Sequence, residues 1–177
     1  MKTITTKKGQ EIILRYPARE DAKQVVEFYN MVGAETEYLS FCGGEYRVTP
    51  EQQEKMIAEA NSSENSTMIL AVADDEIVGI GTISSNQKIK GRHVGTLGIV
   101  VAEKYCNTGI GRSMMDELIM WCRLNGITRK ISLVTSQENK GAIALYEKCG
   151  FEAEGILKNE ICIDGRFSNL VYMGLMI

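Results

Sequence analysis

Two glycines, Gly109 and Gly111, stand just before a stretch with helical periodicity and form the first chemical signal in the sequence. They belong to the segment Cys106-Asn107-Thr108-Gly109-Ile110-Gly111-Arg112, which follows a run typical of a β-strand. Glycine lets backbone N–H groups approach an anion closely, and the N-terminus of a helix adds the positive end of its dipole. The segment predicts a pyrophosphate cradle, although a tight strand-to-helix turn without a ligand would explain the same residues.

The spacing of these glycines excludes two common nucleotide-binding loops. A P-loop ends in Gly-Lys followed by Ser or Thr, and no such run occurs here. The dinucleotide fingerprint requires a third glycine three residues after Gly111, where Met114 stands. ATP and NAD are therefore not the expected ligands.

A second motif begins at Asn139, about thirty residues further along, and reads N-K-G-A-I-A-L-Y-E-K-C-G-F to Phe151. It resembles the N-x-x-A-x-x-L-Y-x-K-x-G-F signature of the GNAT superfamily of acyl-CoA N-acyltransferases, and the Gly109/Gly111 loop resembles that family's Q/R-x-x-G-x-G/A motif. The order of expected helices and strands is also similar over nearly all of the chain. Cys106 stands where the family carries Gln or Arg, so we expect weaker cofactor binding at that corner.

The resemblance implies that the chain binds acetyl-CoA as a cosubstrate. The pantetheine arm would lie along the strand that leads into the loop, beside Ile99, Val100 and Val101, and pair with its backbone as an added strand, with Ile99 and Val101 as the expected partners. The pyrophosphate would accept hydrogen bonds from the N–H groups of Asn107, Thr108, Gly109, Ile110, Gly111 and Arg112. Asn139 would hold the region near the pantetheine and also cap its own helix.

Tyr146 is the candidate catalytic residue, because the family pattern puts this tyrosine beside the sulfur of the thioester. When an amine attacks the thioester, the departing thiolate must be stabilised or protonated. A phenol with a pKa of about 10 can donate a hydrogen bond or a proton to it. The alternative is an aromatic side chain that only packs in the core.

The base that deprotonates the amine is harder to assign. The strand from Val94 to Val101 contains no acid, and by the resemblance Thr96 stands where several relatives carry Glu. The remaining candidates are Glu35, Glu37, Glu103 and His93. Each could equally be a solvated surface group, and a water relay would need no single base. Glu35 and Glu37 are also the predicted substrate-binding residues, because they lie in an acidic segment after the first helix.

These features predict an enzyme that moves the acetyl group of acetyl-CoA to the primary amine of a small molecule, by direct attack in a ternary complex. The acceptor would be amino-acid-like, a polyamine or an amino sugar, because the stretch 33–64 has seven acidic and two basic residues. One alternative is an acetyltransferase for protein N-termini, such as those of ribosomal proteins. The other is a non-catalytic acyl-CoA-binding module, against which the intact Tyr146 argues.

Composition sets the frame for these predictions. The chain has 177 residues, 44% hydrophobic and 24% charged, and we expect one N-acetyltransferase domain over residues 1–177. The net charge of −3 is too small to imply nucleic-acid binding. The apolar runs are too short to span a bilayer and no secretory signal is evident, so we expect a cytoplasmic protein that does not enter a membrane. A homodimer is compatible with these features.

Cysteine and histidine usage bears on the site chemistry. Five cysteines without a C-x-x-C pair indicate free thiols rather than a disulfide framework. The single histidine, His93, argues against a zinc or iron site, and we expect no metal. Cys106 precedes a helix N-terminus next to the predicted phosphate site, where positive potential favours a thiolate. We therefore expect Cys106 to be the most reactive of the five thiols.

Four helices and a mixed sheet would position these residues. One helix opens near Asp21 and is expected to end at Gly33, and the run from Thr49 to Gln52 predicts a second helix that starts with a capping box. Two more helices are predicted over 109–125 and 139–149. The predicted strands cover 11–16, 67–73, 77–84, 94–101, 130–135, 151–156, 160–163 and about 170–176. This order predicts an α/β (α+β) sandwich, a mixed central sheet of about seven strands with helices on both faces.

Overall fold

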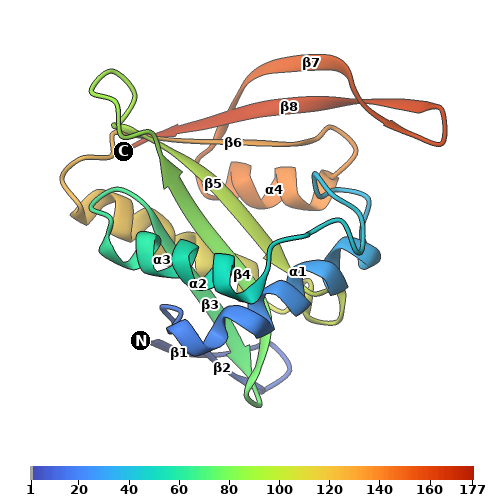
Figure 1. The fold of residues 1–177 in the computed structure, drawn as a ribbon. Helices are drawn as coiled ribbons and strands as arrows, with labels where there is room; N and C mark the ends of the chain where they lie inside the picture. Colours follow the sequence, from blue (N-terminus) through green and yellow to red (C-terminus); the bar gives the residue numbers. More distant parts are fainter. Residues whose placement is uncertain (1) are drawn as a thin grey trace.

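The computed structural model describes residues 2–177 and centres on one eight-stranded sheet. Across the sheet the strands follow the order β1-β2-β3-β4-β5-β6-β8-β7, and β5 with β6 is the one parallel pair among the described strands. The sheet is therefore mixed, as predicted, with eight strands instead of about seven. The strands of Figure 1 are β1 (Lys2–Thr5), β2 (Glu11–Arg15), β3 (Thr67–Ala73), β4 (Glu76–Ser85), β5 (Val94–Val101), β6 (Lys130–Ser136), β7 (Glu152–Ile163) and β8 (Arg166–Met176).

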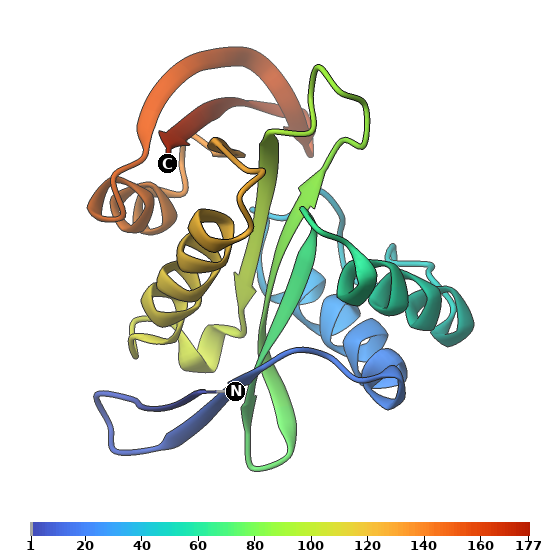
Figure 2. The same ribbon diagram turned by 90° about the vertical axis from the view of Figure 1, so that its left-hand side faces the viewer.

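Four helices cover the two faces of this sheet. Figure 2 shows α1 and α2 on one face and α3 and α4 on the other, which confirms the predicted sandwich. The helices are α1 (Ala22–Glu35), α2 (Pro50–Ser62), α3 (Ile110–Leu124) and α4 (Lys140–Lys148), with the short 3-10 helices η1 (Arg19–Asp21) and η2 (Glu103–Tyr105). Within residues 2–177, no helix is long and apolar enough to cross a membrane.

Each helical layer has its own hydrophobic core. Under α1 and α2, the buried side chains include Val25, Phe28, Ile57, Leu70 and Ile80. Under α3 and α4, they include Ile83, Met114, Leu118, Ile131 and Met173. Burying one such side chain contributes about 1.5–3 kcal/mol, so both layers stabilise the sheet between them.

Helix α1 extends beyond the glycine that was expected to end it. Gly33 lies inside the helix and is buried, and the helix continues to Glu35. A Cβ atom at Gly33 would lie 3.1 Å from the carbonyl carbon and oxygen of Cys42 and 3.2 Å from the nitrogen of Gly43. The glycine therefore serves close packing of the following loop against the helix, and the predicted end at Gly33 is wrong.

The two turns predicted near Asp74 and Asp164 are confirmed, because each joins the two strands of a tight β-hairpin. Asp74 and Asp75, which join β3 to β4, have φ values of 49° and 65°; Asp164 and Gly165, which join β7 to β8, have 50° and 76°. Two consecutive positive φ angles are typical of type I′ turns, whose twist matches the flanking strands. The predicted strands 151–156 and 160–163 are parts of the single strand β7, which has an irregular register between Leu157 and Ile161.

Candidate active site

Strands β5 and β6 pair over three residues and then diverge. The parallel pairing joins Val94–Thr96 to Lys130–Ser132. Beyond it, β5 stays paired with β4, whereas β6 continues beside β8. Figure 1 shows the two strands starting together and separating along their length. The edge of β5 that faces β6 is therefore unpaired over residues 97–101 among the described strands, and we call it the open edge.

The backbone groups on the open edge belong to alternate residues. The N–H of Ala102 donates to the carbonyl of Val78 at 3.0 Å, which makes these two a hydrogen-bonded pair of the β4–β5 ladder. Because such pairs recur at every second residue, Val100 directs its N–H and C=O at β4, whereas Ile99 and Val101 direct theirs at the open edge. Ile99 and Val101, the two expected partners of pantetheine, thus present their backbone groups on the open edge, and Val100 does not.

The loop from η2 into α3 carries a run of backbone donors without partners. Among the hydrogen bonds within residues 2–177, none uses a backbone N–H group from Asn107 to Arg112. Asn107 (φ +62°) and Gly109 (φ +101°) adopt left-handed conformations, and such alternation turns successive N–H groups toward one side. These residues, the cradle, also include the start of the 15-residue helix α3. Unpartnered donors at a helix N-terminus fit a polyphosphate.

Two hydrogen bonds hold the cradle from outside its own backbone. The hydroxyl of Thr108 donates to the carbonyl of Tyr105 at 2.6 Å, and the carbonyl of Thr108 accepts from the N–H of Lys7 at 3.2 Å. The second bond brings the β1–β2 turn, with Lys7 and Lys8, to the cradle. Sequence reasoning missed these two lysines, because nothing in a pattern links a turn to a loop a hundred residues away.

Arg112 is engaged with other residues of the protein through its side chain. Its Nε donates to Asp116 Oδ1 at 2.8 Å, and its Nη1 donates to the carbonyl of Lys148 at 3.1 Å. The hydrogen bond to Asp116 raises the pKa of Arg112. Since the second bond ties α3 to the end of α4, the backbone N–H of Arg112 is the group that belongs to the cradle.

Helix α4 starts at the predicted cap. The side-chain oxygen of Asn139 accepts a hydrogen bond from the N–H of Ala142 at 3.2 Å. Asn139 is therefore the N-cap of α4, as predicted from its sequence position. Its contact with a pantetheine arm stays a prediction.

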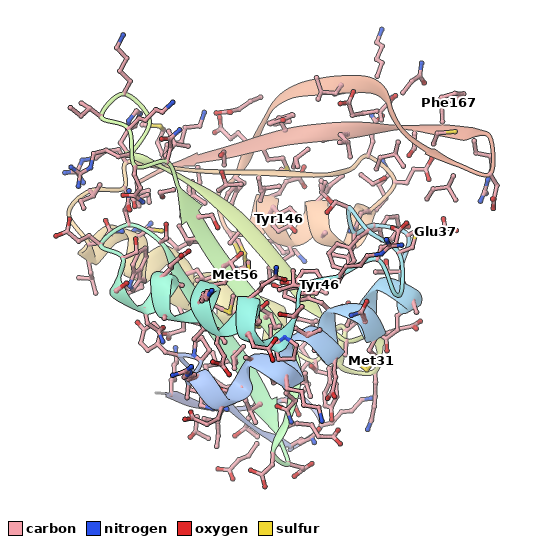
Figure 3. All side chains as sticks on the ribbon, in the orientation of Figure 1. Met31, Glu37, Tyr46, Met56, Tyr146 and Phe167 are labelled. Carbon is pink, nitrogen blue, oxygen red and sulfur yellow. The ribbon has the colours of Figure 1, made fainter. Side chains whose placement is uncertain are left out.

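Tyr146 combines burial with an unused hydroxyl. The residue is 7% exposed and packs against Phe151 with 6.0 Å between ring centroids. Its hydroxyl makes no hydrogen bond within residues 2–177, yet it is not one of the atoms sealed from solvent. Burial, with a smaller effect of Cys149, raises the pKa of Tyr146 to about 12, so the hydroxyl keeps its proton at neutral pH. Figure 3 shows the side chain on α4.

Cys106 lacks the activated thiol predicted from its sequence position. Burial raises the pKa of this thiol, and the carboxylates of Glu103 and Glu35 raise it further. The Sγ atom lies 3.7 Å from the carbonyl oxygens of Val101 and Ala102, which suits weak S–H donation. The direction of this pKa shift contradicts the predicted thiolate, whereas the reactivity of Cys106 relative to the other four thiols stays a prediction.

The face of the sheet that carries α1 and α2 is left open near the splayed strands. Its residues there are exposed or half-buried: Thr82, Thr96, Gly98, Ser132, Val134 and Tyr172. These residues share one face, because directly paired residues, and residues two apart, point to the same side. We call them the acceptor floor. Apart from Tyr172 they carry no titratable side chain, so the floor offers no carboxylate or imidazole base.

An aromatic cluster holds the loop between α1 and α2, residues 36–49. The ring of Tyr46 lies 4.6 Å from that of Tyr29 and 5.4 Å from that of Phe41. The Tyr46 hydroxyl donates to Gln53 Oε1 at 2.8 Å. This loop has no helix or strand of its own, and a loop of this length held so closely is typical of a functional segment.

The acids and the histidine proposed as bases lie in different surroundings. Glu35 accepts a hydrogen bond from the N–H of Glu103 at 2.9 Å, so one of its oxygens is already engaged. Glu37 lies 3.9 Å from Arg166, the first residue of β8. Figure 3 labels Glu37 on the side of the molecule that carries the β7–β8 hairpin. His93 precedes β5, at the end opposite the cradle, about 26 Å from Val101 at 3.3 Å per residue.

Two cavities elsewhere take no part in this arrangement. They measure about 250 and 180 Å³ and share Tyr16 and Trp121 as lining residues. Trp121 lies in the last turn of α3, whereas the cradle is at its first turn, about 15–18 Å away along the helix. The predicted site is therefore an open strand edge with a surface cradle, not an enclosed pocket.

Comparison with known proteins finds relatives over most of the chain. The family model described as "Acetyltransferase (GNAT) family" matches residues 27–151. This span includes the open edge, the cradle and α4.

Two curated relatives match shorter parts. The L-amino acid N-acetyltransferase AaaT of Escherichia coli (strain K12) is 32% identical over 105 residues, which cover 59% of this chain and 65% of that protein. The spermidine N(1)-acetyltransferase of Vibrio cholerae is 31% identical over 78 residues, which cover 44% of this chain and 45% of that protein. The chain thus spans less than two thirds of the length of either relative.

A solved structure matches nearly the full length. The acetyltransferase of the GNAT family from Streptococcus pneumoniae superposes with a TM-score of 0.92 at 34% identity, covering 94% of this chain and 99% of that chain. The fold described above is therefore shared with a crystal structure over nearly all of the chain.

Proposed function

Because the chain belongs to the acetyltransferase (GNAT) family, we propose that it transfers the acetyl group of acetyl-CoA to the primary amine of a small molecule. The observation that carries this proposal is the continuity of two backbone surfaces. The open edge, with the backbone groups of Ile99 and Val101, leads through η2 to the unpartnered N–H groups of residues 107–112. An amide-rich arm followed by a pyrophosphate matches that order.

The residues present fit this cosubstrate. Ile99 and Val101 would pair with its amide-rich arm, the cradle would bind its pyrophosphate, and the turn with Lys7 and Lys8 would add positive charge beside the phosphates. When bound, the cosubstrate supplies an activated acetyl thioester. The protein's own part is to hold the reacting end between the open edge and Tyr146.

Tyr146 would donate a hydrogen bond to the sulfur as it departs. Its pKa of about 12 lies roughly 3.5 units above that of an ordinary thiol, about 8.5. Full proton transfer from the phenol would therefore cost roughly 5 kcal/mol at 1.36 kcal/mol per unit. Donation of a hydrogen bond carries no such cost and is the favoured role.

A water relay would remove the proton from the acceptor ammonium. The acceptor floor has hydroxyl groups but no carboxylate, and Glu35 already accepts a hydrogen bond. The hydroxyls of Thr96 and Ser132, adjacent across β5 and β6, can order water that carries the proton to solvent.

A small amine is favoured over a protein N-terminus. The contact between Glu37 and Arg166 brings the α1–α2 loop next to the β7–β8 hairpin at one side of the proposed site. The acidic segment 33–64 favours a cation, and the named relatives act on amino acids and on spermidine. Amino acids and polyamines are therefore the first acceptors to test.

The test is release of the CoA thiol from acetyl-CoA in the presence of L-amino acids, polyamines, amino sugars and a short peptide with a free N-terminus. We expect release with at least one small amine, and an acetylated product by mass spectrometry. Turnover with the peptide alone would identify an N-terminal acetyltransferase. Binding of acetyl-CoA without turnover on any acceptor would favour the non-catalytic module.

A further inference from the structure

Glu35, the last residue of α1, contacts the segment that precedes the cradle. Its Oε2 atom accepts a hydrogen bond from the backbone N–H of Glu103 at 2.9 Å, although the two residues are 68 positions apart in the sequence. The contact joins the end of a helix on one face of the sheet to the segment that follows β5. It is a specific link between two elements that carry different parts of the proposed site.

The N–H of Glu103 has no acceptor within η2 itself. Glu103 is the first residue of η2, and the first N–H groups of a helix have no partner within the helix. A side chain at the N-cap usually supplies the acceptor, but Ala102 occupies that position and makes no such bond. The carboxylate of Glu35 supplies the acceptor from another element, and its charge strengthens the bond.

We infer that Glu35 is a positioning residue for the binding of acetyl-CoA, not a ligand for the ammonium group of the acceptor. The inference rests on the proposed function. Helix η2 lies between Val101, at the end of the open edge, and Asn107, at the start of the cradle. By capping η2, Glu35 fixes the two halves of the cosubstrate site relative to each other.

The same contact links the acceptor side to the cosubstrate side. The loop 36–49 starts immediately after Glu35, so the residue that caps η2 also anchors the first residue of that loop. A change at Glu35 therefore acts on acetyl-CoA affinity from the opposite layer of the sheet.

Cys106 provides an internal reporter of this contact. Its thiol lies three residues after Glu103, and the carboxylate of Glu35 contributes to its raised pKa, after burial and Glu103. Removing the charge of Glu35 should therefore lower the pKa of Cys106. The thiol reports the charge, whereas acetyl-CoA affinity reports the hydrogen bond.

Two substitutions separate the hydrogen bond from the charge. Glu35→Gln keeps an oxygen that can accept from Glu103 but removes the charge, and Glu35→Ala removes both. Glu27→Ala is the matched control, because Glu27 is an exposed acid on the same helix whose one ion pair, with Lys23, is also exposed. We expect Glu35→Ala to raise the Kd of acetyl-CoA roughly three- to tenfold in calorimetric titration, with Glu35→Gln and Glu27→Ala near wild type.

The pH dependence of Cys106 alkylation, resolved by mass spectrometry, is the second readout. Both Glu35→Gln and Glu35→Ala should lower the apparent pKa of Cys106, and Glu27→Ala should not. Glu35→Gln should therefore keep the acetyl-CoA affinity of wild type but not the wild-type pKa of Cys106. This combination is expected if the Glu35 side chain caps η2, and it is not expected if Glu35 only contributes to packing.

Glu103→Pro removes the donor from the other side of the bond. Proline is tolerated at the first position of a helix because it lacks only an N–H that the helix does not use. In that background, Glu35→Ala should cause no further loss of affinity, which is the signature of a coupled pair. Additive effects of the two changes would overturn the inference.

Two other outcomes separate the inference from the proposed function. If wild-type protein binds acetyl-CoA and Glu35→Ala binds it equally well, Glu35 does not position the cradle. A raised KM for the amine in both Glu35 variants, with unchanged acetyl-CoA affinity, would assign Glu35 to the acceptor instead. If wild-type protein itself fails to bind acetyl-CoA, the proposed function fails first.

Discussion

Tyr146 is a buried residue whose hydroxyl still reaches solvent and makes no hydrogen bond within residues 2–177, so the hydroxyl is free to donate to a ligand. Tyr146→Phe removes the hydroxyl and keeps the ring against Phe151. We expect turnover to fall roughly 10–10³-fold, the range for loss of one transition-state hydrogen bond. Acetyl-CoA affinity and the melting temperature should stay near wild type. Steady-state kinetics on the best amine measure turnover, calorimetric titration measures the affinity, and thermal unfolding measures the melting temperature.

The control for this change is Tyr16→Phe. Tyr16 is an exposed residue that follows β2 and lines a cavity together with Trp121 in the last turn of α3, away from the cradle. The substitution should leave all three quantities unchanged. Full activity of Tyr146→Phe would mean that solvent or another donor serves the sulfur. A joint loss of affinity and melting temperature would identify Tyr146 as a packing residue.

At the scale of single residues, motifs predicted chemistry and could not predict contacts. Tyr146 and the cradle could be predicted because each lies within a local sequence motif. The unpartnered hydroxyl of Tyr146 and the unpartnered backbone N–H groups of the cradle are compatible with the proposed roles as hydrogen-bond donors. The partner of Glu35 and the approach of Lys7 to Thr108 depend on residues 68 and about a hundred positions away. For Cys106, the sequence revealed the helix N-terminus but not the two carboxylates that raise the pKa of the thiol.

Among the elements, the turn into α3 depends on the left-handed conformation of Gly109, with φ +101° and open space where a Cβ would stand. Gly109→Ala should cost about 1–2 kcal/mol of stability through backbone strain. The added methyl group would also stand on the open side of the cradle and weaken acetyl-CoA binding at least severalfold. Urea denaturation and calorimetric titration measure the two effects.

Gly126 offers a matched control at the other end of the same helix. It has φ +71° and the same open surroundings, so Gly126→Ala should lose similar stability. Its acetyl-CoA affinity should remain that of wild type. Equal losses of affinity in both variants would mean that strain, and not the cradle, controls binding.

A second element-scale feature joins the start of α1 to the end of β2. Asp21 accepts hydrogen bonds from both terminal nitrogens of Arg15, at 2.6 and 2.7 Å, and from the N–H of Ala18 at 2.6 Å. The bond to Arg15 is the main reason that the pKa of Asp21 is lowered. Asp21→Asn should therefore reduce the free energy of unfolding at pH 7 by about 1–3 kcal/mol.

The sign of the pH dependence follows from that lowered pKa. The ionised carboxylate stabilises the fold fully above the unfolded-state pKa, about 3.9, and this stabilisation is lost as the pH falls through the lower folded-state value. Wild type and Asp21→Asn should differ by a constant amount from pH 7 to about 5 and converge below about 4. Urea unfolding of both proteins at several pH values tests this expectation. The control is Arg19→Ala, which removes the ion pair with Glu54 at the surface and should change the free energy of unfolding little. A difference that persists undiminished at acid pH would contradict the assignment.

Local signals located the helices well, and tertiary contacts caused the errors. The capping box before α2 formed as predicted, with Thr49 and Gln52 bonded in both directions at 3.3 and 2.9 Å. Gly33 did not end α1, because its lack of a side chain serves the packing of Cys42 and Gly43. Strand β1 escaped prediction since its short polar stretch Lys2–Thr5 becomes a strand only by pairing with β2.

For the whole molecule, the decisive feature is the divergence of β5 from β6. The apolar run Val94–Val101 predicts a strand, but nothing in it indicates that one edge is paired for three residues and open for the next five. That difference arises because β6 follows β8 instead of β5, a relation between strands far apart in the sequence. The sheet class could therefore be predicted, whereas the exposed edge required the structure.

Residue-resolved amide hydrogen exchange, measured by NMR with and without saturating acetyl-CoA, tests the central claim most directly. We expect slower exchange at Ile99 and Val101 and across residues 107–112, because acetyl-CoA would accept their hydrogen bonds. Val100, whose N–H is already directed at β4, should change little. Unchanged exchange at Ile99 and Val101, or protection confined to the cavities around Tyr16 and Trp121, would contradict the account.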